Sequence, residues 1–178
     1  YNHQELFNLL QNTYDKKVIL FGVSFALLDF LDFCKASGLE IQNSENLIII
    51  ETGGMKGRKE EMTKDALLTI LKKGFNSDKI YSEYSMTELL SQAYSLGENI
   101  YECPPWMKVL VRNAEDPFSY EKAGRTGAVN IIDLANRHTC SFIATQDLGK
   151  ILPENENKFQ ILGRIDHSDI RGCSLLVS

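Results

Sequence analysis

Residues 46–54 read NLIIIETGG, an apolar run that ends in a glutamate, a threonine and two glycines. A continuous apolar run of this length is typical of a strand buried on both faces, as the strands of parallel sheets are. Glycine adopts positive φ more readily than other residues, so Gly53 and Gly54 predict a tight turn. The sequence therefore predicts a buried strand over Asn46–Glu51 that leads directly into a glycine turn.

Further strands and helices alternate around this run. Lys17–Phe21 (KVILF) and Lys79–Glu83 predict two more buried strands. Apolar residues recur at helical spacing elsewhere, and this pattern predicts helices over Gln4–Gln11, Phe25–Ser37 and Thr63–Lys73, and one more from about Glu88. The alternation predicts a fold of the α/β class, a parallel sheet with flanking helices. Ligands of such sheets bind outside the carboxyl ends of the strands, which here are followed by residues 22–24, 52–55 and 84–88.

The sequence changes its pattern after Pro104. Short alternating stretches are separated by turn-forming residues, which predicts an antiparallel β region with strands at Met107–Arg112, Gly127–Asp133, Phe142–Thr145 and Phe159–Leu162. We therefore expect an α/β subdomain over residues 1–103, a mainly antiparallel region over 104–162, and a hinge with the start of a short lid over 163–178.

Composition narrows the possible functions. The 178 residues carry a net charge of -5, which argues against a nucleic-acid-binding protein because such proteins present a basic surface to phosphates. No apolar run approaches the roughly 20 residues that a membrane helix needs. The four cysteines are scattered without a CxxC pair, so we expect free thiols and a cytoplasmic protein.

The segment Tyr84–Glu88 (YSMTE) combines groups that suit a nucleotide. A hydroxyl and backbone N–H groups at a helix N-terminus suit a phosphate, and a carboxylate beside them suits Mg²⁺ shared with that phosphate. The ring of Tyr84 could stack on a base. On spacing alone, an ordinary helix cap with Thr87 and a first-turn Glu88 is the favoured interpretation of the segment.

Two later motifs add a carboxylate and a guanidinium. Asp147 lies in ATQDLG and can accept hydrogen bonds from a ribose diol, although an aspartate before a glycine is also common in turns. Arg164 lies in GRID and can bind phosphate or ribose, although a surface ion pair would explain it as well.

The order and spacing of these motifs resemble the adenylate-forming superfamily, which includes acyl-CoA synthetases, luciferases and peptide-synthetase adenylation domains. Within it, the segments ETGGMKG (51–57) and RGCS (171–174) look most like the LuxE-type acyl-protein synthetases. The phenylacetate-CoA ligases are the nearest neighbouring branch. The resemblance extends from about Val18 to Ser178.

The resemblance implies a nucleotide site at the strand ends. Tyr84 matches the aromatic residue that packs on adenine, and Ser85 follows it in the nucleotide-binding segment. Thr87 matches the hydroxyl that contacts the α-phosphate, and Glu88 matches the Mg²⁺ ligand. Gly53 and Gly54 match the loop where the nucleotide meets the acyl pocket.

Four further residues take roles from the same resemblance. Asp147 matches the carboxylate that holds the ribose hydroxyls, and Arg164 matches the arginine beside the nucleotide. Asp166 matches the hinge of the C-terminal lid. Cys173 fits the cysteine that takes the acyl group as a thioester, although a small buried apolar residue is an equally good interpretation.

Two features depart from the family pattern. Ser85 stands where the family usually has glycine, which restricts the backbone if that position needs positive φ. The glycine-rich loop that cradles the β- and γ-phosphates is absent from these residues, and in the family it lies upstream. We therefore expect the chain to be the C-terminal portion of such an enzyme and to be inactive alone.

The implied reaction uses ATP and Mg²⁺ to convert a carboxylic acid, a fatty acid by analogy, to an acyl-adenylate and then to a thioester on a protein cysteine. An acyl-CoA or fatty-acid reductase subunit is the expected acceptor. Two alternatives stay open, a phenylacetate-type acyl- or aryl-CoA ligase and a catalytically silent binding module that keeps the shape of the nucleotide site.

Overall fold

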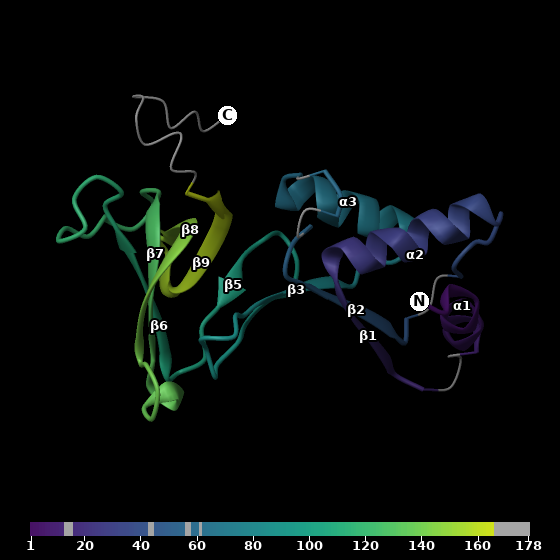
Figure 1. Ribbon diagram of the computed structural model, residues 1–178, viewed down its shortest axis with the longest axis horizontal. Coiled ribbons are helices and arrows are strands. Elements are labelled where there is room, and N and C mark those ends of the chain that lie inside the picture. Colours follow the sequence, from purple (N-terminus) through teal and green to yellow (C-terminus); the bar gives the residue numbers. More distant parts are fainter. Residues whose placement is uncertain (13–15, 43–44, 56–57, 61, 166–178) are drawn as a thin grey trace. The chain divides into compact units, whose positions relative to one another are not determined.

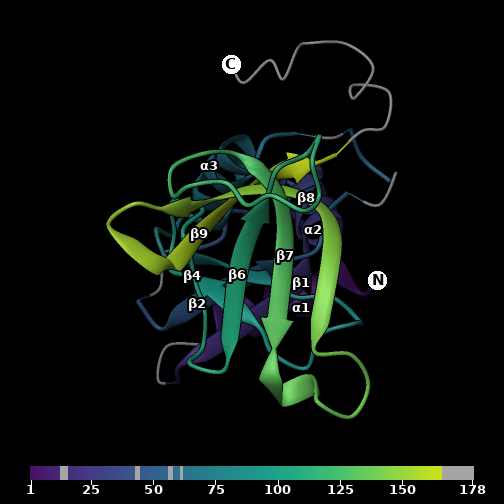
Figure 2. The ribbon, with the colours of Figure 1, turned by 90° about the vertical axis from the view of Figure 1, so that its left-hand side faces the viewer.

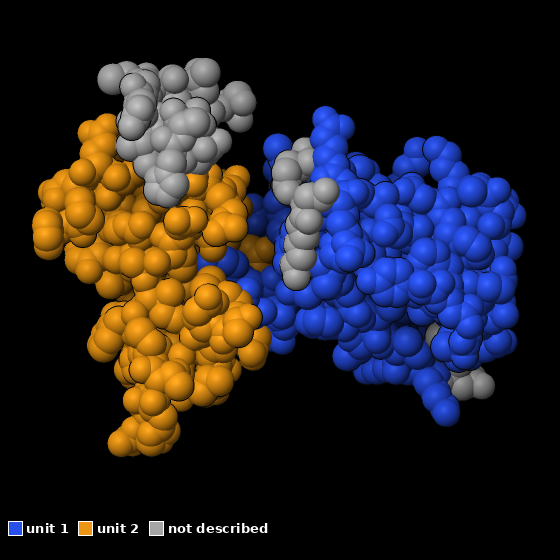
Figure 3. All heavy atoms as spheres, in the orientation of Figure 1, with its two compact units in different colours: residues 1–85, 94–99 blue, residues 86–93, 100–178 orange. Residues whose placement is uncertain are grey.

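The computed structural model describes residues 1–12, 16–42, 45–55, 58–60 and 62–165 (Figure 1). The chain divides into two compact units, Tyr1–Ser85 with Tyr94–Asn99 and Met86–Ala93 with Ile100–Ser178 (Figure 3). The first unit holds the helices and the parallel strands, and the second holds a set of antiparallel strands. Within the described ranges, no helix is both long and apolar enough to cross a membrane.

Parallel strands form the centre of the first unit. Its strand order is β1-β2-β3-β4, with bounds β1 Val18–Val23, β2 Leu47–Thr52, β3 Ile80–Tyr84 and β4 Ala93–Ser95. Val18 pairs with Leu47, and Ile49 pairs with Ile80, both in parallel register. The predicted parallel sheet is therefore confirmed, and the carboxyl ends of β2 and β3 lie at the same edge.

Three helices accompany this sheet, α1 His3–Gln11, α2 Ser24–Ala36 and α3 Lys64–Phe75. Figure 1 shows α2 and α3 over one face of the strands. The core lies between these layers, where the rings of Phe30 and Phe75 stack with centroids 6.0 Å apart. Burial of such aromatic side chains is the main favourable term in forming the unit.

The ends of α3 show how local sequence sets helix limits. Thr63 caps the first turn, because its hydroxyl accepts a hydrogen bond from the Ala66 N–H. The helix runs past the predicted end at Lys73 and stops at Asn76, which adopts the left-handed conformation with φ 49°. Asparagine tolerates that conformation better than most residues, so it replaces glycine as the terminating signal.

The second unit is antiparallel, as predicted (Figure 2). Its strand order is β5-β9-β8-β7-β6, with bounds β5 Tyr101–Glu102, β6 Met107–Arg112, β7 Gly127–Asp133, β8 Phe142–Leu152 and β9 Asn155–Arg164. A short 3₁₀ helix, η1 Leu134–Asn136, follows β7. Strands β8 and β9 are longer than predicted because they pair with each other through a tight turn between Leu152 and Asn155.

The predicted helix from about Glu88 is wrong. Residues 85–92 form no helix, and the chain makes a single turn in which the Leu89 N–H donates to the Met86 carbonyl at 3.0 Å. The next two N–H groups, of Leu90 and Ser91, donate to the Asp133 carboxylate at 2.9 Å each. A carboxylate from a distant strand therefore takes the donors that a helix would have used.

Candidate active site

The turn after β2 lies beside the end of β3. Thr52 pairs with Glu83 in the parallel register, so Gly53 follows β2 at the edge where Tyr84 ends β3. Gly53 has φ +67°, a conformation that residues with a Cβ rarely adopt. The predicted glycine turn is confirmed, and it brings four predicted residues, Gly53, Gly54, Tyr84 and Ser85, to one edge of the first unit.

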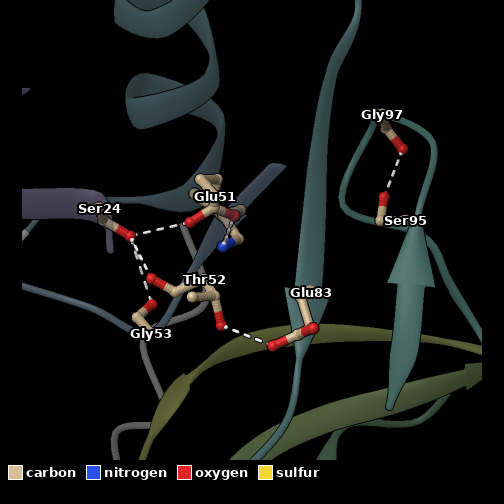
Figure 4. A network of polar contacts seen from close by, with 8 residues as sticks. Ser24, Glu51, Thr52, Gly53, Glu83, Ser95 and Gly97 are labelled. Atoms are coloured by element: carbon tan, nitrogen blue, oxygen red, sulfur yellow. Dashed lines mark hydrogen bonds and ion pairs between the residues drawn. The ribbon is translucent and has the colours of Figure 1, made fainter. Parts of the chain in front are cut away.

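The buried carboxylate of Glu51 stabilises this turn. Glu51 has no solvent exposure and forms an ion pair with Lys64, the first residue of α3. The Ser24 hydroxyl donates to Glu51 Oε2 at 2.8 Å and lies 3.2 Å and 3.4 Å from the carbonyl oxygens of Thr52 and Gly53 (Figure 4). Because a buried charge is costly unless it is paired, this network ties α2 and α3 to the turn.

A second carboxylate holds the turn from the other face of the sheet. Successive side chains of a strand point to opposite faces, so Thr52 points away from the Glu51 network. Its hydroxyl donates to Glu83 Oε1 at 3.1 Å, and Ser85 donates to the same oxygen at 2.7 Å. The Tyr94 hydroxyl donates to Glu83 Oε2 at 2.9 Å. Neither Glu51 nor Glu83 was among the residues predicted from sequence.

Tyr84 and Ser85 differ in their surroundings. The Tyr84 side chain is buried, and the Ser85 side chain is partly exposed and bound to Glu83. The role of Tyr84 in packing on adenine stays a prediction. Ser85 is absent from the described residues that have positive φ, so serine in place of glycine causes no backbone strain here.

The turn that carries Thr87 and Glu88 is fixed within the second unit. Both side chains are exposed. The backbone is held at two points, because Asn136 Nδ2 donates to the Glu88 carbonyl at 2.7 Å and Asp133 accepts the N–H groups of Leu90 and Ser91. The turn therefore presents a hydroxyl and a carboxylate to solvent on a rigid base.

Asp133 is the centre of that base. Its carboxylate is fully buried and also accepts from the Ser91 hydroxyl at 2.6 Å and from the Ala135 N–H at 3.1 Å. Burial by itself would raise the pKa of Asp133, but the hydrogen bonds from Ser91, Leu90 and Ala135 outweigh it and lower the pKa. Sequence reasoning missed Asp133, although an aspartate as the last residue of an apolar strand was a visible signal.

Asp147 and Arg164 are brought together by the β8–β9 pairing. They are cross-strand partners, with Arg164 Nε 3.6 Å from Asp147 Oδ1. Asp147 lies inside β8, not in a turn after a strand as its motif suggested, and its side chain is 18% exposed against 74% for Arg164. The arrangement places a partly buried carboxylate beside a long, exposed cationic side chain. The carboxylate suits the hydroxyl groups of a ligand, and the guanidinium suits a neighbouring phosphate.

The predicted nucleotide residues Gly53, Gly54, Tyr84 and Ser85 lie in the first unit, and Thr87, Glu88, Asp147 and Arg164 lie in the second. The predicted hinge Asp166 and the predicted acyl acceptor Cys173 lie outside the described residues.

The described residues contain no cluster of three or more His, Cys, Asp or Glu side chains that would hold a metal ion by itself. Glu88 is instead a single exposed carboxylate next to the Thr87 hydroxyl. That donor set fits Mg²⁺, which is commonly bound by one or two carboxylates together with substrate phosphates.

Comparison with known proteins places the chain in a family. A family model for the acyl-protein synthetase LuxE matches residues 2–178. The chain belongs to the LuxE acyl-protein synthetase family. Among curated protein sequences, none matches it significantly.

Solved structures share the fold. ATP-bound MatB from Rhodopseudomonas palustris is 17% identical with a TM-score of 0.62, covering 92% of this chain and 33% of that chain. An open 2-hydroxyisobutyryl-CoA ligase in complex with 2-HIB-AMP and CoA is 15% identical with a TM-score of 0.68, covering 93% and 37%. A variant of o-succinylbenzoate CoA synthetase from Bacillus subtilis is 14% identical with a TM-score of 0.62, covering 93% and 34%. The LuxE-family chain thus spans about a third of these structures, and the predicted fold is confirmed.

Proposed function

We propose that the protein activates a carboxylic acid, a fatty acid by family analogy, with ATP as an acyl-adenylate and transfers the acyl group to a protein cysteine. The match of the LuxE family model over residues 2–178 carries this proposal. The pairing of Asp147 with Arg164 and the fixed turns at Gly53 and Glu88 support it, because they supply the polar groups that a nucleotide needs.

In the first step the substrate carboxylate attacks the α-phosphate of ATP and releases pyrophosphate. Thr87 donates its hydroxyl to the phosphate, Asp147 accepts hydrogen bonds from the ribose hydroxyls, and Arg164 lies beside the nucleotide. Mg²⁺ held by Glu88 would supply charge neutralisation at the phosphates. Catalysis in such a site comes mainly from positioning and from electrostatic stabilisation of the developing charge.

In the second step a thiolate attacks the mixed anhydride, which forms the thioester and releases AMP. Cys173 is the proposed acceptor within the LuxE family, and Asp166 the proposed hinge between the two steps. A reductase subunit would then receive the acyl group. A free reactive thiol suits the reducing cytoplasm, where we place the protein.

A CoA ligase of the phenylacetate type is the second candidate. It uses the same first step, and the 2-hydroxyisobutyryl and o-succinylbenzoate enzymes that share the fold are named for transfer to CoA. The two candidates differ in the thiol that accepts the acyl group, so the acceptor distinguishes them.

Mass spectrometry after incubation of the full-length protein with ATP, Mg²⁺ and a panel of fatty and aromatic acids tests the proposal. We expect an acyl adduct on Cys173 that hydroxylamine removes and that Cys173→Ala abolishes, with adenylate formation intact. AMP release that requires added CoA and leaves no adduct would support the CoA ligase. If no acid gives AMP or an adduct, the silent binding module is the better description.

A further inference from the structure

Three hydroxyl groups converge on the Glu83 carboxylate in the first unit. Thr52 Oγ1 and Ser85 Oγ donate to Oε1 at 3.1 Å and 2.7 Å, and the Tyr94 hydroxyl donates to Oε2 at 2.9 Å. We call these four residues the Glu83 cluster. They come from the end of β2, the end of β3 and β4, so strand pairing assembles the cluster at one edge of the sheet.

The number of hydroxyl protons determines what the Glu83 cluster can bind. Each hydroxyl carries one proton, and in all three residues that proton is directed at Glu83. Burial, together with the hydrogen bond to Glu83 and its charge, raises the pKa of Tyr94, so the phenol keeps its proton. The remaining lone pairs of the hydroxyls and of Glu83 Oε2 can accept hydrogen bonds, so the cluster offers acceptors and no donors.

The charge of the Glu83 cluster also favours a ligand that donates hydrogen bonds. Among the ion pairs of the described chain, none involves Glu83, whereas Glu51 on the neighbouring strand is paired with Lys64. The cluster is also reachable from solvent, because Tyr94 is 41% exposed and the other three residues are partly exposed. An accessible, negatively charged group of acceptors favours a ligand that brings donors or positive charge.

We propose that the Glu83 cluster binds a hydrogen-bond-donating substituent, a hydroxyl or an ammonium group, on the carboxylic acid substrate. The position supports this role, because Thr52 directly precedes the Gly53 turn and ligands of parallel sheets bind at the carboxyl ends of the strands. The inference rests on the proposed acid-activating function and adds the substrate class, a hydroxy or amino acid.

The same charge orients the substrate. The reacting carboxylate of the acid is repelled by Glu83, while its donor substituent is attracted, so the two ends of the substrate take opposite directions in the site. A second carboxylate in place of the donor would lie against Glu83 without compensation. Dicarboxylic acids of the same chain length should therefore be poor substrates.

Acid-dependent ATP–pyrophosphate exchange by the full-length protein tests the inference. The substrates are a straight-chain acid, its α- and β-hydroxy and amino derivatives, and the dicarboxylic acid of equal length. We expect one of the donor-bearing acids to exceed the plain acid in kcat/KM by more than about 10-fold, because an added hydrogen bond to a charged acceptor contributes about that much binding. The dicarboxylic acid should be the poorest substrate.

Two variants distinguish the effect of the Glu83 charge from the effect of the shape of the cluster. Glu83→Gln keeps the size of the side chain and removes its charge, so it should reduce kcat/KM for the donor-bearing acids by about 10-fold more than for the plain acid. Tyr94→Phe removes one accepting hydroxyl and keeps the carboxylate, so it should reduce the preference for donor-bearing acids by less than Glu83→Gln does. Tyr120→Phe, at an exposed tyrosine of the second unit, is the matched control.

The outcomes distinguish this inference from the proposed function. Exchange with the plain acid that equals or exceeds every donor-bearing acid would overturn the substrate class and leave the acid-activating function standing. An equal loss with all acids in Glu83→Gln would also overturn it, because that pattern indicates a purely structural carboxylate. Exchange with no acid at all would overturn both.

Discussion

Two lysines of the first unit illustrate how burial changes the value of an ion pair. Lys64 pairs with fully buried Glu51, whereas Lys59 pairs with Asp29 and Asp32 at the surface. Removing the cation from a buried carboxylate leaves an uncompensated charge, so Lys64→Met should lower the free energy of unfolding by about 3 kcal/mol. Lys59→Met is the matched control and should cost about 1 kcal/mol or less. Urea unfolding of both variants measures the difference.

The two lysine variants also test the link to the Gly53 turn. If the Glu51 network fixes that turn, Lys64→Met should increase the amide hydrogen-exchange rates of residues 52–54, and Lys59→Met should leave them unchanged. Equal stability losses for the two variants, with no change in exchange at the turn, would show that Glu51 does not support it.

Asp133 makes the stability of the second unit depend on pH. Its pKa is lowered from the ordinary 3.8 in the folded state, so the carboxylate stabilises the fold above that pH and the stabilisation disappears as the pH falls through the folded-state pKa. Asp133→Asn should be less stable than wild type at pH 7 by about 2–4 kcal/mol, because an amide cannot accept all four hydrogen bonds. Its unfolding midpoint should also depend less on pH below about 4.

Asp116→Asn serves as the control for that pH dependence. Its pKa is also lowered, by hydrogen bonds from Ser119 and Phe118, but the residue is exposed in a turn. Its replacement should hardly alter the unfolding midpoint at pH 7. A flat pH profile for wild type between pH 5 and pH 2, as followed by urea unfolding, would contradict the role assigned to Asp133.

At the scale of elements, local signals predicted the strands well and distant contacts decided the rest. The run NLIIIETGG is apolar enough to specify β2 and its turn without outside help. The expected helix at Glu88 failed because Asp133, far along the chain, takes the N–H groups of Leu90 and Ser91. The Glu83 cluster could not be predicted from sequence because it also depends on distant contacts. Its members meet only when β2, β3 and β4 lie together.

The β8–β9 hairpin gives a prediction at this scale. The register shifts between Leu148 and Gly149, next to Asp147, and a Cβ added at Gly149 would lie 2.6 Å from the Gln160 carbonyl oxygen. Because the backbone cannot yield easily there, Gly149→Ala should destabilise the second unit by about 1–3 kcal/mol. It should also weaken ATP binding by displacing Asp147 from Arg164. Calorimetry with ATP and urea unfolding measure the two effects.

Gly54→Ala is the matched control for stability, because a Cβ added at Gly54 meets nothing within 4 Å. Its unfolding free energy should stay within about 0.5 kcal/mol of wild type. A Gly149→Ala variant as stable as wild type would mean that the hairpin relaxes around the added methyl group, and the close approach of β8 to β9 would then have no energetic importance.

At the scale of the whole molecule, the length of the chain bears on the proposed activity. The chain spans about a third of the solved structures that it resembles, and residues 1–17 contain no glycine-rich phosphate loop. Positioning of the β- and γ-phosphates is a large share of catalysis in phosphoryl-transfer sites. The 178 residues alone should therefore fold and yet give no acid-dependent pyrophosphate exchange, while the full-length protein exchanges.

Asp147→Asn in the full-length protein tests whether the residues described here form part of its nucleotide site. If the residues described here hold the ribose, this variant should raise the KM for ATP by about 10-fold or more, because a charged hydrogen-bond acceptor is lost. The KM for the acid should change little, since Asp147 is assigned to the nucleotide alone. Exchange by the isolated chain, or an unchanged KM for ATP in Asp147→Asn, would require a nucleotide site built from other residues.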